Sequence, residues 1–183
     1  MSTNNITELV RQDINDWIVN FVEASNEFYG HKFPVCPYAR AARLRQESTV
    51  CVYESGSIRE FIWTSITDNL LSNKYKVILC VLPPRAQWLL KFDRYVAGLN
   101  KKIIPHDLYA LLGQALGTIS KYPGLLNSGP YCVLGVNKLS AVLPAVESLK
   151  SAGYYDNWSD QHYKDIVELR QQSHEKYSKK DSD

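Results

Sequence analysis

The sequence predicts a single α/β domain with a small, mostly parallel sheet of roughly three or four strands, covered by about six helices. Short runs rich in β-branched residues alternate with longer stretches whose apolar residues recur at three- and four-residue steps. The length of 183 residues suits one domain, and 45% hydrophobic with 22% charged residues is an ordinary globular composition. We expect residues 1–177 to form this domain and residues 178–183 to be a frayed polar tail.

The N-terminal part predicts two helices. Residues 5–27 carry one apolar stripe, and this helix is expected to end near Gly30. A second, short helix is expected to begin at Pro37, because the fixed φ of proline and its missing N–H suit the first helical position.

A strand, a helix and a second strand follow. Residues 49–53 are rich in β-branched residues, which indicates a strand. Ser57 and Glu60 have the spacing of a capping box and open the next helix. Residues 76–82 form an almost continuous apolar run, which is typical of a parallel strand covered on both faces. Together they predict a βαβ unit.

Two further helices are predicted from apolar stripes over residues 88–99 and 108–119, the second capped by Asp107. Residues 101–106 are a candidate for the fourth strand.

The C-terminal third predicts a loop, a strand and two helices. Glycine and proline mark residues 122–130 as a loop, and residues 131–136 as the next strand. A helix over 139–152 should start or kink at Pro144, and a last helix covers 159–176. One side of that last helix carries Tyr163, Ile166, Val167 and Arg170.

Charge is nearly balanced but unevenly distributed. With 21 basic and 19 acidic residues, the net charge of +2 gives no argument for nucleic-acid or membrane binding. Residues 31–47 and 85–102 are basic, whereas residues 1–30 are acidic. These segments are either solvated helix faces or a pocket for a small anion or an acidic partner.

Three of the four cysteines, Cys51, Cys80 and Cys132, lie in apolar runs and are expected to act as small buried hydrophobes. The absence of a CxxC pair and of metal-ligand histidine spacing predicts no metal site. Because the first residues do not resemble a secretory signal, we expect a cytoplasmic protein with reduced thiols.

The fourth cysteine, Cys36, is the candidate catalytic residue. At the start of a helix its sulfur would lie near free backbone N–H groups, and Arg40 and Arg43 would follow on the same face. We therefore expect a thiol that titrates below neutrality, with Arg40, Arg43, Tyr38 and His31 as substrate contacts. His31 either acts as a base, if the turn at Gly30 folds back, or is a surface histidine of that turn. The alternative is a structural cysteine that fills a gap beneath Tyr38.

The segment Cys36-Pro37-Tyr38-Ala39 resembles the CPYC motif of glutaredoxins and the CPFA motif of omega-class glutathione transferases. That resemblance implies that Cys36 forms a mixed disulfide with glutathione, which would be the cofactor. It also implies a monothiol mechanism, because Ala39 replaces the second cysteine. An uncharacterised bacterial family with an N-terminal CPFA-type motif is also similar, at Trp17, at the CPYA segment and at Asn127–Tyr131.

Two functions stay open, and with them the question of whether the chain is an enzyme. One is a thiol-dependent protein, such as an oxidoreductase, that uses Cys36 on a small anionic or thiol substrate. The other is a non-catalytic binding or accessory domain that acts through a protein–protein interface, alone or as an oligomer. Tyr154, Tyr155 and Trp158 are expected to close the core at a turn, or else to form an aromatic wall for a ligand or partner.

Overall fold

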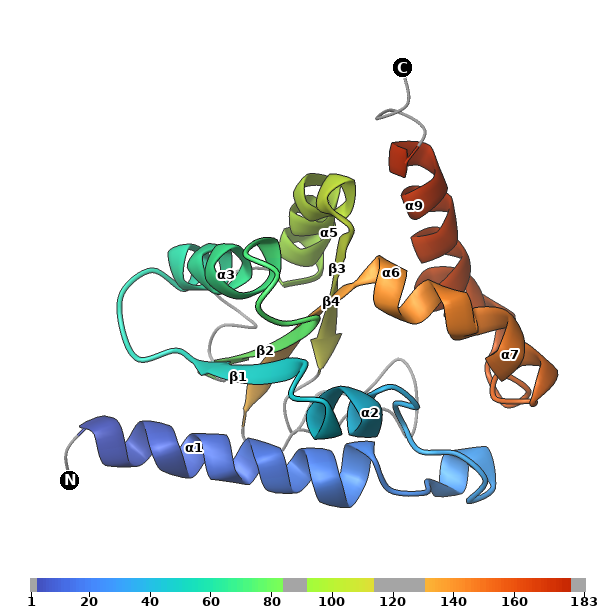
Figure 1. The fold of residues 1–183 in the computed structure, drawn as a ribbon, viewed down its shortest axis with the longest axis horizontal. Coiled ribbons are helices and arrows are strands. Elements are labelled where there is room, and N and C mark those ends of the chain that lie inside the picture. The colour runs from blue at the N-terminus through green and yellow to red at the C-terminus, as the bar shows by residue number, and fades with distance from the viewer. Residues whose placement is uncertain (1–2, 84–91, 114–130, 179–183) are drawn as a thin grey trace.

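One four-stranded sheet forms the centre of the molecule, in a computed structural model that describes residues 3–83, 92–113 and 131–178. Helices cover both faces of the sheet, and a further group of helices lies beyond one edge (Figure 1). The predicted α/β class is therefore confirmed. In spatial order the strands are β1 (Ser48–Val52), β2 (Val77–Leu82), β4 (Cys132–Lys138) and β3 (Leu108–Gly113).

The pairing of the strands confirms the βαβ unit and corrects the rest of the sheet. Strands β1 and β2 are parallel, with Ser48 opposite Val77, and α3 (Ile58–Ile66) connects them. Strand β4 runs antiparallel to both β2 and β3, so the sheet is mixed rather than mostly parallel. Burial on both faces makes the apolar runs of β2 and β4 resemble parallel strands, although an apolar run does not specify direction.

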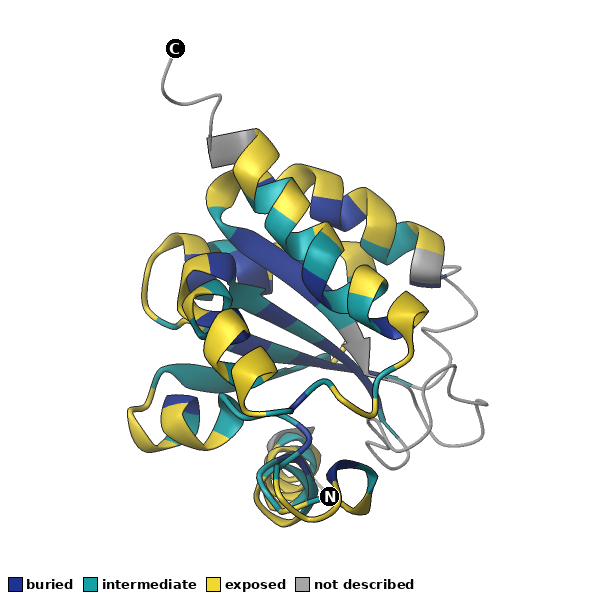
Figure 2. Cartoon of the chain, turned by 90° about the vertical axis from the view of Figure 1, so that its right-hand side faces the viewer, coloured by how far each residue is buried: buried dark blue, intermediate teal, exposed yellow. Residues whose placement is uncertain are grey.

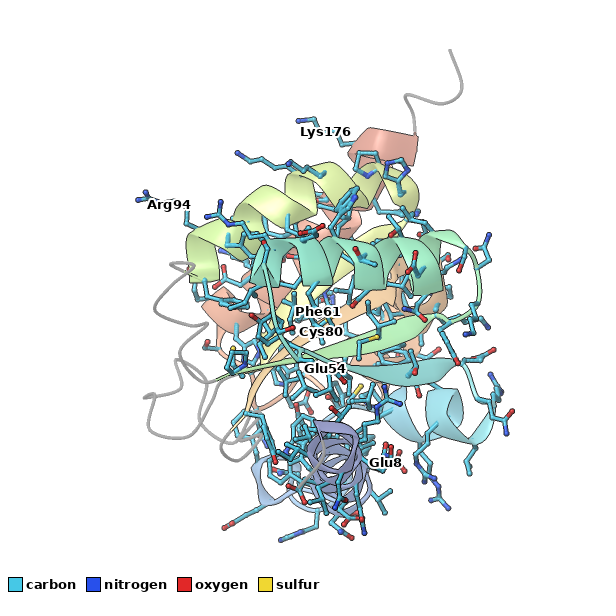
Figure 3. The ribbon with its side chains drawn as sticks, turned by 90° about the vertical axis from the view of Figure 1, so that its left-hand side faces the viewer. Glu8, Glu54, Phe61, Cys80, Arg94 and Lys176 are labelled. Atoms are coloured by element: carbon cyan, nitrogen blue, oxygen red, sulfur yellow. The ribbon has the colours of Figure 1, made fainter. Side chains whose placement is uncertain are left out.

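Each face of the sheet has its own apolar core. Helices α3 and α5 (Phe92–Ile103) cover one face, where Ile62, Ile78 and Leu134 are completely buried. Helix α1 (Thr3–Trp17) covers the other face, where Ile14 packs with Val81 and Val133. Figure 2 shows buried residues, in dark blue, along the strands between the covering helices, whereas β1 is of intermediate burial throughout. Figure 3 places Phe61 and Cys80 between α3 and the sheet, whereas Arg94 and Lys176 project outward.

The first predicted helix is shorter than expected, and the second begins later. Helix α1 passes into a π-helical turn over Ile18–Val22, and a 3₁₀ turn covers Glu27–Tyr29. Residues Pro37 and Tyr38 form a turn, closed by the Ala39 N–H, which donates to the Cys36 carbonyl at 3.3 Å. Helix α2 (Ala39–Leu44) therefore begins two residues after Pro37, and Cys36 is not its cap.

The expected helix over 108–119 is wrong for the described part of that range. Leu108–Gly113 form the edge strand β3, and residues 114–119 lie outside the described residues. Residues 101–106 are not the fourth strand, because they complete α5 and form a 3₁₀ turn. Asp107 caps a different helix from the predicted one, α6 (Leu139–Val142): its Oδ1 accepts the Ser140 N–H at 2.8 Å.

The C-terminal region consists of short helices beyond the β3 edge. Pro144 interrupts the first of them, as predicted. Ser159 caps α8 (Asp160–Tyr163) by accepting the His162 N–H at 3.2 Å, also as predicted. The bounds are α6 Leu139–Val142, a 3₁₀ turn Leu143–Ala145, α7 Val146–Ser151, α8 Asp160–Tyr163, a π-helical turn Lys164–Glu168, and α9 Leu169–Ser178.

Three of the predictions fall on parts of the chain that the structure does not describe. They are residues 88–91 of one predicted helix, the loop over 122–130, and the tail over 179–183. Asn127, which contributes to the resemblance with the bacterial family, lies within that loop.

Candidate site around Cys36 and Arg170

The segment that carries Cys36 is held in place by hydrogen bonds to residues far away in the sequence. The Cys36 N–H donates to the Val22 carbonyl at 3.1 Å. The Tyr154 hydroxyl donates to the Val35 carbonyl at 2.6 Å, and the Tyr38 hydroxyl donates to the Val142 carbonyl at 2.9 Å. These contacts fasten the chain before α2 to the C-terminal helices, so Cys36 lies where the two ends of the chain meet.

Aromatic rings surround this junction. The Tyr154 side chain is buried at 4% exposure and stacks on Tyr29, with ring centroids 4.6 Å apart and an interplanar angle of 14°. Edge-on or tilted rings complete the cluster: Phe33, Tyr155 and Trp158. The Trp158 Nε1–H donates to the Tyr29 hydroxyl at 3.2 Å. The prediction that this turn closes the core is confirmed for Tyr154.

The pKa of the Cys36 thiol differs from the predicted one. Burial raises its pKa above the ordinary value and outweighs every other influence. Backbone N–H groups of Tyr38 and Ala39, followed by the Arg170 guanidinium, lower the pKa, and the Glu23 carboxylate raises it. The expected titration below neutrality is therefore corrected: the helix-end N–H groups do act on the sulfur, but desolvation of the thiolate dominates.

The cation that acts on Cys36 is Arg170 of α9, which the sequence analysis placed on a helix face but not in a site. Its Cζ lies 5.4 Å from the centroid of the Tyr109 ring on β3. Its Nε is buried and has no hydrogen-bond partner within the described part of the chain. The signal was present in the sequence, because an arginine on the apolar stripe of an amphipathic helix must be buried at least in part.

The other predicted site residues differ in whether they take part in the site around Cys36. Tyr38 is next to it, since both Cys36 and Arg170 influence its pKa, which burial raises. Arg43 forms a two-pronged ion pair with Glu23, with both N–O distances 2.7 Å. Arg40 is exposed. His31 is exposed in a left-handed turn with φ of 58°, and it makes no hydrogen bond or ion pair with Cys36 among the described residues.

Two of the other three cysteines are buried as expected, whereas Cys51 is only partly buried. Cys80 and Cys132 are completely buried in their strands, and burial raises the pKa of Cys132 to about 11. All four cysteines are free thiols. Within residues 3–83, 92–113 and 131–178, no group of three or more His, Cys, Asp and Glu side chains is arranged to hold a metal ion. No helix in these ranges has both the length and the apolar character that a membrane span requires.

Comparisons with protein-family models, with curated proteins and with solved structures find no match to this chain. The likeness of the CPYA segment to glutaredoxins, omega-class glutathione transferases and the bacterial CPFA family therefore stays a prediction. The class that the structure shows is the α/β fold, in which the Arg170 guanidinium acts electrostatically on the Cys36 thiol.

Proposed function

We propose that this is a cytoplasmic thiol-dependent protein that uses Cys36 on a small anionic or thiol substrate. The observation that carries the proposal is the electrostatic influence of the Arg170 guanidinium on Cys36, because a guanidinium favours both a thiolate and a bound anion. Two backbone N–H groups support the same sulfur. The free cysteines suit a reducing compartment.

The reaction that fits a single cysteine is thiol–disulfide exchange. The Cys36 thiolate attacks one sulfur of a small disulfide, a new S–S bond forms to Cys36, and the old S–S bond breaks. The second half of the substrate leaves as a thiolate and takes up, through solvent, the proton that Cys36 lost. A small thiol then attacks the mixed disulfide, forms a new disulfide with the bound half and releases the Cys36 thiol, so the small disulfide is the oxidant and the small thiol the reductant.

The test uses the full chain with the disulfide of 3-mercaptopropionate, followed by mass spectrometry of each cysteine peptide. We expect one mixed disulfide on Cys36, none on the buried Cys80 and Cys132, and loss of the reaction in Cys36→Ser. The rate should rise steadily from pH 7 to pH 9, because burial raises the pKa of the attacking thiol. Equal consumption of the disulfide by wild type and Cys36→Ser would refute the thiol function.

A non-catalytic binding or accessory domain is the second candidate, and two observations favour it. The raised pKa of Cys36 keeps the thiol protonated at neutral pH. Helix α1 also leaves two large apolar side chains about half exposed, Ile6 at 52% and Leu9 at 50%, which suits contact with a partner protein. Under this function the exchange experiment returns unmodified protein, while binding at the site is retained.

A further inference from the structure

Arg170 carries a positive charge that nothing in the described part of the chain balances. None of the ion pairs found there includes Arg170, and its buried Nε has no hydrogen-bond partner among the described residues. The groups with the strongest electrostatic influence on it are Tyr109, Cys36, Tyr155 and Tyr38. All four are neutral at neutral pH, because burial raises the pKa of each. A desolvated, unpaired cation destabilises a fold, so a binding role gives this arginine a reason to be there.

Two phenol groups have hydrogen-bond donors to spare: Tyr109, whose ring centroid lies 5.4 Å from the Arg170 Cζ, and Tyr155, on which Arg170 acts electrostatically. The hydroxyl of Tyr38 is already used, because it donates to the Val142 carbonyl. The hydroxyls of Tyr109 and Tyr155 make no hydrogen bond with any described residue, and Arg170 acts electrostatically on both. A guanidinium and two phenolic O–H groups are all donors, and such a set requires a ligand that supplies acceptors.

We propose that Arg170, Tyr109 and Tyr155 bind the carboxylate group of a small molecule. The planar fork of a guanidinium matches two carboxylate oxygens, and one positive charge balances one negative charge.

A dianionic phosphate would leave one charge without a partner. The Arg43 guanidinium is occupied by Glu23, and the Asp165 carboxylate acts on Tyr109 from the helical turn that leads into α9. This inference rests on the proposed function in one respect. The carboxylate site and the Cys36 thiol are taken to act on the same small molecule.

The binding experiment is carried out in the full chain with Cys36→Ala, so that the thiol reaction cannot contribute. Propionate, inorganic phosphate and chloride are titrated at constant ionic strength, and the ¹H–¹⁵N resonance of the Arg170 Nε–H reports binding directly. We expect a saturable shift with propionate, weaker binding of phosphate and no saturation with chloride. Loss of a charge-assisted hydrogen-bond pair predicts that Arg170→Gln weakens propionate binding about 10- to 100-fold, measured by calorimetry.

Arg40→Gln is the matched control, because it removes the same charge from an exposed position and should leave propionate binding unchanged. Arg170→Lys keeps the charge without the fork and should weaken binding less than Arg170→Gln, which keeps the test decisive if the glutamine variant unfolds. Tighter binding of phosphate than of propionate would overturn the carboxylate assignment. A titration with propionate that does not saturate would overturn the site. Propionate binding that is the same in Arg170→Gln and in the parent protein would also overturn it. Neither result bears on disulfide exchange by Cys36, which is scored separately in wild type.

Discussion

Replacing Tyr154 with alanine is expected to lower the free energy of unfolding by about 3–5 kcal/mol, the usual range for removing a large buried aromatic ring. The ring contacts Tyr29, Phe33, Tyr155 and Trp158, and its hydroxyl holds the carbonyl of Val35 next to Cys36. The substitution leaves a cavity and frees one anchor of the Cys36 segment. Urea unfolding followed by circular dichroism measures the change.

Tyr154→Phe separates the ring from the hydroxyl. It keeps the aromatic contacts and leaves the Val35 carbonyl without its donor, which predicts a loss of only about 1–2 kcal/mol. If Tyr154→Ala were less than about 1 kcal/mol below wild type, the aromatic cluster would not be the part of the fold that joins the two ends of the chain.

The second large effect is expected at Asn100, whose buried side chain binds the backbone of the edge strand β3. Its Nδ2 donates to the Ala110 carbonyl at 3.0 Å, and its Oδ1 accepts the Ala110 N–H at 2.7 Å. Asn100→Ala leaves both backbone groups without a partner at the edge of the sheet, so we predict a loss of about 2–4 kcal/mol. The same unfolding measurement gives the value.

Asn20→Ala serves as the matched control, because Asn20 is exposed and its replacement should change stability by less than about 0.5 kcal/mol. Equal effects of the two asparagine substitutions would contradict the structural role given to Asn100. This strand matters for the site, since Tyr109 precedes Ala110 and lies against Arg170.

The parts of the fold that sequence predicted well are those determined by local chemistry. Ser57 and Ser159 have side chains that accept N–H groups from the first helical turn, and both cap the helices assigned to them. Pro144 interrupts its helix for an equally local reason. The βαβ unit could be predicted because a helix between two apolar runs connects parallel strands.

The parts that were not predicted depend on distant contacts. Leu108–Gly113 is an apolar run that fits a helix stripe or a buried strand equally well, and only pairing with β4 and the two bonds from Asn100 decide for the strand. In the site, the sequence pointed to Cys36 and Tyr38 but chose nearby arginines as their partners. Chain distance favoured Arg40 and Arg43, whereas the cation that acts electrostatically on the sulfur is Arg170 of α9.

The central claim is that Cys36 and Arg170 belong to one site, and the pKa of the Cys36 thiol tests it most directly. Alkylation of Cys36 by iodoacetamide, an uncharged reagent, is measured against pH by mass spectrometry in wild type, Arg170→Gln and Arg40→Gln. Half-maximal reaction in wild type should lie above about pH 8.5, the ordinary value for a thiol.

Removal of the Arg170 charge withdraws a group that favours the thiolate, so Arg170→Gln should move the midpoint to higher pH while Arg40→Gln leaves it in place. A midpoint near neutrality, or identical midpoints in Arg170→Gln and wild type, would contradict the account.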